Sequence, residues 1–126
     1  MKTMKDQVTS IEQSKRLIDL GVPAGKASMV YRKRYIKNDY VLDMESREME
    51  VIAPAFTVAD LLGLLPPKIS CQDPSDGNFR MRRYMGENGI EWVVDYDRFI
   101  ANDVSIINVL VEAIILLVST KHELNI

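Results

Sequence analysis

The sequence predicts an α+β fold, a small antiparallel sheet with helices packed on one face, in the order α-β-β-α-β-β-α. Three observations predict it. Residues 104–118 are apolar at twelve of fifteen positions, which is typical of a helix enclosed by other structure. Asn88-Gly89 stands between two extended runs, as in a β-hairpin. Thr9 and Thr57 each precede an acidic residue by three positions, a pattern of helix N-termini.

The first helix is expected to start with a capping box. The Thr9 hydroxyl would accept a hydrogen bond from the Glu12 amide, while the Glu12 carboxylate would accept one from the Thr9 amide. The helix should end at Gly21, because glycine readily adopts the left-handed conformation of that position, and Pro23 should open one further turn. Residues 1–8 are expected to be flexible.

Two short strands are expected between residues 29 and 44, where aromatic and β-branched side chains favour extended structure. The turn-prone dipeptide Asn38-Asp39 separates them. A short helix should follow, capped by Thr57, with Asp60 at its third position. Proline should end it at Pro66-Pro67. Its predicted apolar face consists of Val58, Leu61, Leu62 and Leu65.

The Asn88-Gly89 turn sets the predicted register of the hairpin. With these two residues as the loop, one face is mostly apolar and should lie on the helices, while the other carries matched charges and should face water. The predicted cross-strand pairs are Met85 with Trp92, Arg83 with Val94, Met81 with Tyr96, Arg82 with Asp95, and Arg80 with Asp97.

The last helix is expected to be the central support of the fold. Its three polar residues, Ser105, Asn108 and Glu112, fall on one stripe, which we interpret as an edge that faces water or a second subunit. A buried functional carboxylate at Glu112 is the alternative. Fifteen residues rise only about 22 Å, short of the roughly 30 Å hydrocarbon core, so the prediction is that no membrane is crossed.

Composition is typical of one globular domain spanning residues 1–126. The net charge of -2 provides no overall attraction to nucleic acid or anionic lipid. The lone Cys71 excludes an internal disulfide and, with the single His122, the usual structural zinc sites. We therefore expect a cytoplasmic protein without a cofactor.

One segment has the composition of a nucleic-acid contact. Between residues 31 and 37 basic and aromatic side chains alternate, a pattern that can grip a phosphate backbone and stack on bases. Arg80, Arg82 and Arg83 would extend it if the two strands were neighbours. Acidic residues follow directly, so a solvated, locally compensated strand face is the alternative. The candidate contacts are Tyr31, Arg32, Arg34, Tyr35 and Lys37.

Catalysis has less support in the sequence. His122 lies at the end of the last helix, where the helix dipole favours a cation, and Cys71 stands in a loop without a cue for an activated thiolate. We expect no enzymatic activity, and a small enzyme with an unrecognised carboxylate site is the alternative. Trp92, with Met81, Met85 and Tyr96, is expected in the core, or alternatively lining a ligand groove.

Two segments carry a resemblance to a known group. These are residues 9–21, which read TSIEQSKRLIDLG, and the segment from Pro54 to Pro66 with its PAFT and LLGLLP motifs, together with the closing apolar helix. With them the chain resembles small uncharacterised proteins of Bacteroides-type gut bacteria, commonly encoded in prophages or other mobile elements. The resemblance implies an intracellular α+β fold and a mobile-element origin, and it implies no activity or site residue.

Three functions remain open from the sequence. The first is a non-enzymatic interaction module, an accessory protein that binds another protein or itself as a homodimer, because the apolar last helix offers more surface than a small domain covers. The second is a nucleic-acid-binding module that uses residues 31–37. The third is the small enzyme with an unrecognised carboxylate site.

Overall fold

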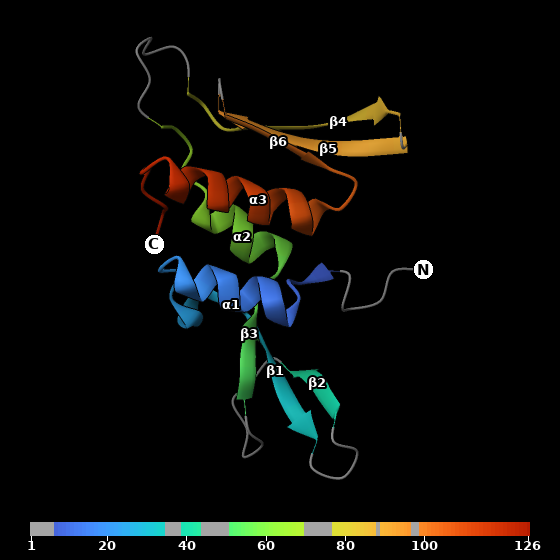
Figure 1. Cartoon of the computed structure of the whole chain (residues 1–126), viewed down its shortest axis with the longest axis vertical. Helices are drawn as coiled ribbons and strands as arrows, with labels where there is room; N and C mark the ends of the chain where they lie inside the picture. The colour runs from blue at the N-terminus through green and yellow to red at the C-terminus, as the bar shows by residue number, and fades with distance from the viewer. Residues whose placement is uncertain (1–6, 35–38, 44–50, 70–76, 88, 97–98) are drawn as a thin grey trace. The chain divides into compact units, whose positions relative to one another are not determined.

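The computed structural model describes residues 7–34, 39–43, 51–69, 77–87, 89–96 and 99–126, which form two compact units. The N-terminal unit comprises residues 1–60 together with Ile126, and the C-terminal unit comprises residues 61–125. Each unit combines a three-stranded antiparallel sheet with helical structure (Figure 1). The α+β class is confirmed, but the strands belong to two sheets where the sequence predicted one.

The N-terminal sheet has the strand order β2-β1-β3, with β1 at Met29–Arg34, β2 at Asp39–Asp43 and β3 at Val51–Ala55. β1 pairs antiparallel with both neighbours, so it is the central strand. The two strands expected between residues 29 and 44 are therefore confirmed. β3 was not predicted, because it contains Pro54, which lacks an amide donor and is tolerated at a sheet edge.

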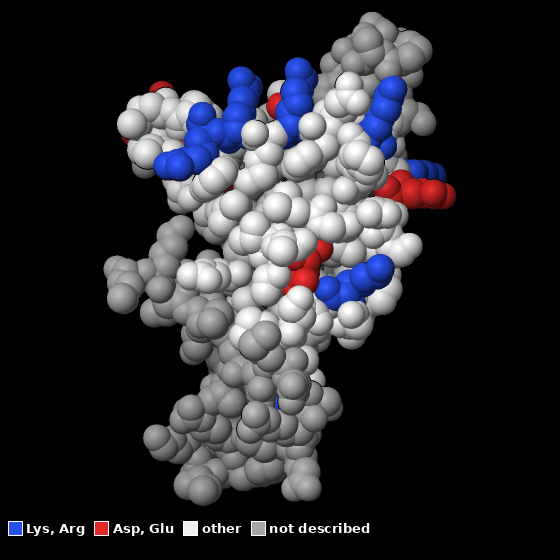
Figure 2. All heavy atoms as spheres, turned by 180° about the vertical axis from the view of Figure 1, so that it is seen from behind, with Lys and Arg blue, Asp and Glu red and all other residues white. Residues whose placement is uncertain are grey.

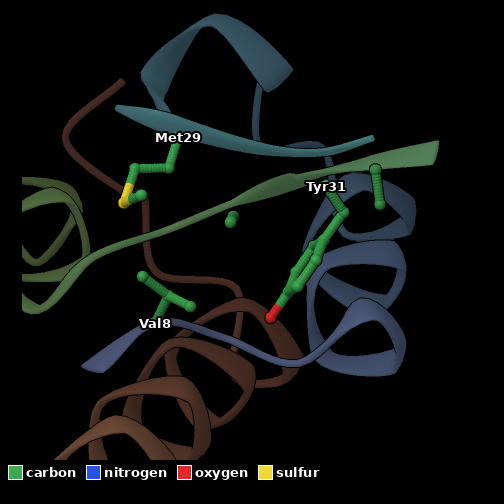
Figure 3. Packing of buried hydrophobic residues seen from close by; sticks show 5 residues of the cluster. Val8, Met29 and Tyr31 are labelled. Carbon is green, nitrogen blue, oxygen red and sulfur yellow. The ribbon is translucent and has the colours of Figure 1, made fainter. Parts of the chain in front are cut away.

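Large side chains of β1 lie opposite small side chains of β3. Met29 pairs with Ala55 and Tyr31 with Ala53, and all four are buried. Val8 joins this cluster, as Figure 3 shows. Val8, at the end of the segment expected to be flexible, forms an antiparallel bridge with Thr57 instead.

Helix α1 (Ile11–Asp19) begins one residue later than predicted. Its capping box uses Ser10 and Gln13, whose side chains exchange hydrogen bonds with each other's backbone amides at 3.1 and 2.9 Å. The prediction of Thr9 with Glu12 was wrong because the Thr9 side chain is used elsewhere. Its buried hydroxyl accepts a hydrogen bond from the Phe56 amide at 3.0 Å.

The end of α1 follows the prediction. Gly21 adopts a φ of +101°, its amide donates to Ile18 O, and the Val22 amide donates to Leu17 O. These two hydrogen bonds form a Schellman motif, in which the left-handed residue closes the last turn. The further turn expected after Pro23 is the short 3₁₀ helix η2 (Ala24–Lys26).

Helix α2 (Val58–Leu64) begins with the predicted cap. The Thr57 hydroxyl accepts from the Asp60 amide at 3.2 Å, and the Asp60 carboxylate accepts from the Thr57 amide at 2.9 Å. The predicted apolar face is partly wrong, because Leu62 is exposed and Leu64 is buried in its place.

The C-terminal sheet is a meander of β4 (Arg80–Gly86), β5 (Gly89–Tyr96) and β6 (Phe99–Asp103). The hairpin is confirmed, but Gly86 pairs with Gly89, so the turn lies one residue earlier than predicted. β6 was not predicted, because it is short and ends in Asn102 and Asp103, residue types that are uncommon in strands.

The hairpin register therefore differs from the prediction by two residues in each pair, while the residues that share a face remain the same. Arg80 pairs with Asp95 and Arg83 with Trp92, where the sequence predicted Asp97 and Val94. The observed register brings Tyr84 opposite Glu91, and their side chains form a hydrogen bond of 2.5 Å. These favourable cross-strand pairs are a physical reason for the shift.

Helix α3 (Ile106–Ser119) begins at the cap residue Ser105, whose hydroxyl accepts from the Asn108 amide at 3.2 Å. It packs on β5 and β6, with Leu117 among the helix residues that lie against Val94 and Tyr96 of the sheet. Of the predicted polar stripe, Asn108 and Glu112 are exposed and the cap residue Ser105 is half-buried. No helix within the described part of the chain is long and apolar enough to cross a bilayer.

Candidate functional site

The predicted nucleic-acid strand does not present its first two side chains at the surface. On β1, Tyr31 is 3% exposed and Arg32 is 0% exposed. Arg34 ends the strand opposite Asp39, and Tyr35 and Lys37 lie outside the described residues. The hypothesis for residues 31–37 therefore loses two of its five contacts as surface groups and remains a prediction for the rest.

The second basic segment lies in a different sheet. Arg80, Arg82 and Arg83 are exposed on β4, which pairs with β5, whereas β1 pairs with β2 and β3. The two segments are not neighbouring strands, so the combined basic patch considered from the sequence is not formed by strand pairing. Figure 2 shows a row of basic side chains over the C-terminal sheet.

The apolar face of the β4–β5 hairpin is only partly covered. At one end, Val94, Tyr96 and Ala101 face α3. At the other end, Met85 is 74% exposed and its cross-strand partner Ile90 is 47% exposed. In Figure 1 this end of the hairpin reaches past the first turn of α3, so the helix does not cover it.

An arginine and a tryptophan stand beside these two exposed residues. The Arg83 guanidinium lies 5.1 Å from the centre of the Trp92 ring, within the range of a cation–π contact. Trp92 and Met81 are half-buried. We call this surface the hairpin patch, and it consists of Met81, Arg83, Met85, Ile90 and Trp92.

The opposite face of the same sheet is polar. Arg80 donates to the buried Asp95 carboxylate, with 2.9 Å between Nε and Oδ1, and Ile100 flanks this pair on β6. A depression of about 180 Å³ is lined by Arg80, Arg82, Asp95 and Ile100. Because Asp95 neutralises Arg80, Arg82 is the residue that provides a positive charge there.

Two tyrosines of this unit have raised pKa values for different reasons. The hydrogen bond to Glu91 stabilises the protonated phenol of Tyr84 and is the main cause that raises its pKa, against smaller opposing effects of Asn102 and Arg82. Burial raises the pKa of Tyr96, whose hydroxyl donates to Pro66 O at 2.6 Å. Both phenols are therefore neutral hydrogen-bond donors at physiological pH.

The residues considered for catalysis do not form a site in the described structure. Glu112 is exposed on α3, so the alternative of a buried carboxylate there is wrong. His122 follows the end of α3, where its amide donates to Leu117 O, and Cys71 lies outside the described residues. Among the residues with described positions, no three His, Cys, Asp or Glu side chains gather as metal ligands.

The sequence placed Trp92, Met81, Met85 and Tyr96 together in the core or along a groove. Only Tyr96 is a core residue, and Met85 is the most exposed of the four. The missed signal was the length of the hairpin. Its two strands have seven and eight residues, so they extend beyond what one end of α3 covers.

Comparison of the chain with protein-family models, with curated proteins and with solved structures finds no match.

Proposed function

We propose that this protein is an interaction module that binds another protein through the hairpin patch. The observation that carries the proposal is the exposed pair Met85 and Ile90 beside the Arg83–Trp92 contact. Tryptophan, arginine and methionine are enriched at the centres of protein interfaces, and an apolar surface with a polar rim is typical of one. Here the polar side chain beside the apolar residues is that of Arg83.

The backbone of the patch is already held by strand pairing before binding, which lowers the backbone entropy lost on association. Each strand residue is held by the cross-strand pairing, and Arg83 is oriented by the Trp92 ring. Loss of one central contact in such a surface costs about 2 kcal/mol or more, which is roughly a thirtyfold loss of affinity. The expected mobile-element origin is part of the same proposal, and the neighbouring genes would test it.

The proposed site lies on the hairpin, whereas the sequence placed the interaction surface on the last helix. The hypothesis of self-association rested on apolar residues left uncovered around the last helix. Every apolar residue of α3 is buried or half-buried within the chain, so α3 does not support it. In the present proposal a homodimer would instead use the hairpin patch.

The test compares capture of a partner by the wild-type protein and by two variants. Met85→Asp with Ile90→Asp should abolish capture, because it places two carboxylates in the apolar part of the patch. Ile126→Asp, which changes another exposed apolar side chain, should leave capture unchanged. The captured protein is then purified and its affinity measured by calorimetry. Equal binding of all three proteins would reject the hairpin patch.

Sedimentation measurements test the second possible occupant, a further copy of the chain. A dimer that dissociates in Met85→Asp with Ile90→Asp would identify the patch as a homodimer interface. A monomer at micromolar concentration would exclude self-association and leave a different protein as the partner.

A further inference from the structure

Strand β4 is at the edge of its sheet. Among the described strands it pairs with β5 alone, whereas β5 pairs on both sides. An edge strand presents a row of backbone amides and carbonyls that a further strand can bind. β4 spans Arg80–Gly86, long enough for an extended segment to form several backbone hydrogen bonds.

The charges on β4 argue against a second copy of β4 as that further strand. In an antiparallel pair related by a twofold axis, a centre at Arg82 places Arg82 opposite its own copy, and a centre at Arg83 does the same for Arg83. A centre between them places Arg82 opposite Arg83. Like charges directly opposite each other destabilise a sheet, so these central registers of β4 with itself are disfavoured.

The same charges favour an acidic partner, and the alternation of β4 places them on defined faces. Arg82 lies on the polar face beside the depression, where Asp95 already neutralises Arg80. Met81 and Met85 lie on the other face, in the hairpin patch, with Arg83 between them. A strand added to this edge would therefore meet Arg82 on one face and, on the other, the apolar side chains of Met81 and Met85 on either side of Arg83.

We propose that the open edge of β4 binds an extended segment of a partner protein, with acidic side chains beside Arg82 and apolar side chains beside Met81 and Met85. This proposal rests on the proposed function and specifies the chemistry of the partner. The backbone of β4 supplies affinity, and the alternation of charged and apolar side chains supplies the register. Binding should weaken as salt increases, because part of it is electrostatic.

The test uses a synthetic peptide of alternating valine and glutamate, with blocked ends, added to the isotope-labelled full chain. Binding should protect alternate amides of residues 80–86 from hydrogen exchange, because only every second amide of an edge strand faces outward. Two control peptides, one of alternating valine and lysine and one with its valines and glutamates grouped in blocks, should give no such protection.

Charge-reversed variants test the role of the arginines. Arg82→Glu with Arg83→Glu should lower the affinity for the valine–glutamate peptide about tenfold or more. Lys15→Glu with Lys26→Glu makes the same change of charge at exposed positions of the N-terminal unit and should leave the affinity unchanged.

Four results would overturn the proposal. These are no binding of the valine–glutamate peptide at millimolar concentration, binding without protected amides, equal binding of the lysine peptide or of single-stranded DNA, or protection of β4 by a homodimer in the free protein. None of them removes the hairpin patch as a protein-binding surface, because Met85→Asp with Ile90→Asp tests that surface through capture of a partner.

Discussion

Strands β1 and β4 have similar sequences and opposite environments. β1 reads MVYRKR and β4 reads RMRRYMG, so each mixes arginine, tyrosine and methionine. On β1, Tyr31 and Arg32 point to opposite faces of the sheet and both are buried. On β4, Arg82, Arg83 and Tyr84 are all exposed. The same composition therefore produces an interior strand in one unit and a surface strand in the other.

The position of each strand in its sheet is one cause of the difference. β1 is central, with β2 and β3 on its two sides, and its Tyr31 side chain joins a cluster that includes Val8 and Ala53. β4 has a partner on one side only among the described strands. Helix α3 covers only part of the face of the sheet to which β4 belongs. Strand order, which depends on distant residues, decides which basic segment is available to a ligand.

The largest expected effect is the difference in the free energy of unfolding between substitutions of two arginines. Arg32→Ala should lower the free energy of unfolding by about 3 kcal/mol or more, because it removes a large, fully buried side chain that has interaction partners. Arg82→Ala should change it by no more than about 0.5 kcal/mol, because Arg82 is exposed. Urea denaturation followed by circular dichroism measures both. Equal losses would contradict the contrast between the strands.

A pair of tyrosine substitutions gives the next effect. The Tyr31 hydroxyl donates to the buried Thr9 carbonyl at 2.7 Å (Figure 3 shows the side chain), so Tyr31→Phe should cost about 1–2 kcal/mol. Tyr84→Phe removes an exposed hydrogen bond to Glu91 and should cost a few tenths of a kcal/mol. The same denaturation measurement applies, and a larger loss for Tyr84→Phe would reverse the comparison.

Features with a local cause were predictable from the sequence. The cap of α2 at Thr57 and Asp60 and the end of α1 at Gly21 depend on residues within one helical turn, and both match the structure. The cap of α1 was misplaced because Thr9 bonds with Phe56, which lies 47 positions further along the chain. The residues next to Thr9 in the sequence do not indicate this contact with Phe56.

The candidate site was less predictable than the elements. The sequence assigned the residues of the hairpin correctly to its two faces. Successive side chains point to opposite faces of a strand, and a register shift of two residues does not change this. It did not reveal that Met85 and Ile90 lie beyond the part of the sheet that α3 covers, or that Tyr31 and Arg32 are interior. Both facts depend on how separate elements pack, and the length of the hairpin strands is a signal for the first of them only.

The helix cap at Asp60 should make the protein sensitive to acid. Burial raises the pKa of the Asp60 carboxyl, but hydrogen bonds from Ser28 and Thr57 outweigh burial and lower it below 3.8. The stabilisation is therefore present above pH 3.8 and is lost as the pH falls through the lower folded-state value. Asp60→Ala should cost on the order of 1 kcal/mol at pH 7. This cost should shrink below pH 3.8 in denaturation experiments, and a cost independent of pH would contradict the assignment.

The two helix ends provide a direct comparison between the units, and the substitution at Lys121 has a small expected effect. Both α1 and α3 close with a Schellman motif, but the left-handed residue is Gly21 in one, with φ of +101°, and Lys121 in the other, with φ of +66°. A φ near +60° is strained but accessible to a side-chain-bearing residue, whereas +101° lies outside that region.

Gly21→Ala should therefore destabilise the protein by about 1–2 kcal/mol although a Cβ there would meet no atom within 4 Å, because the cost lies in the backbone alone. Lys121→Gly should stabilise it by about 0.5–1 kcal/mol. Removing the lysine also removes a favourable charge at the end of α3, so the matched control is Lys121→Ala, which removes the charge and keeps the strain. Thermal unfolding of the three variants should rank Lys121→Gly above Lys121→Ala, and the reverse order would show that charge outweighs backbone strain at this helix end.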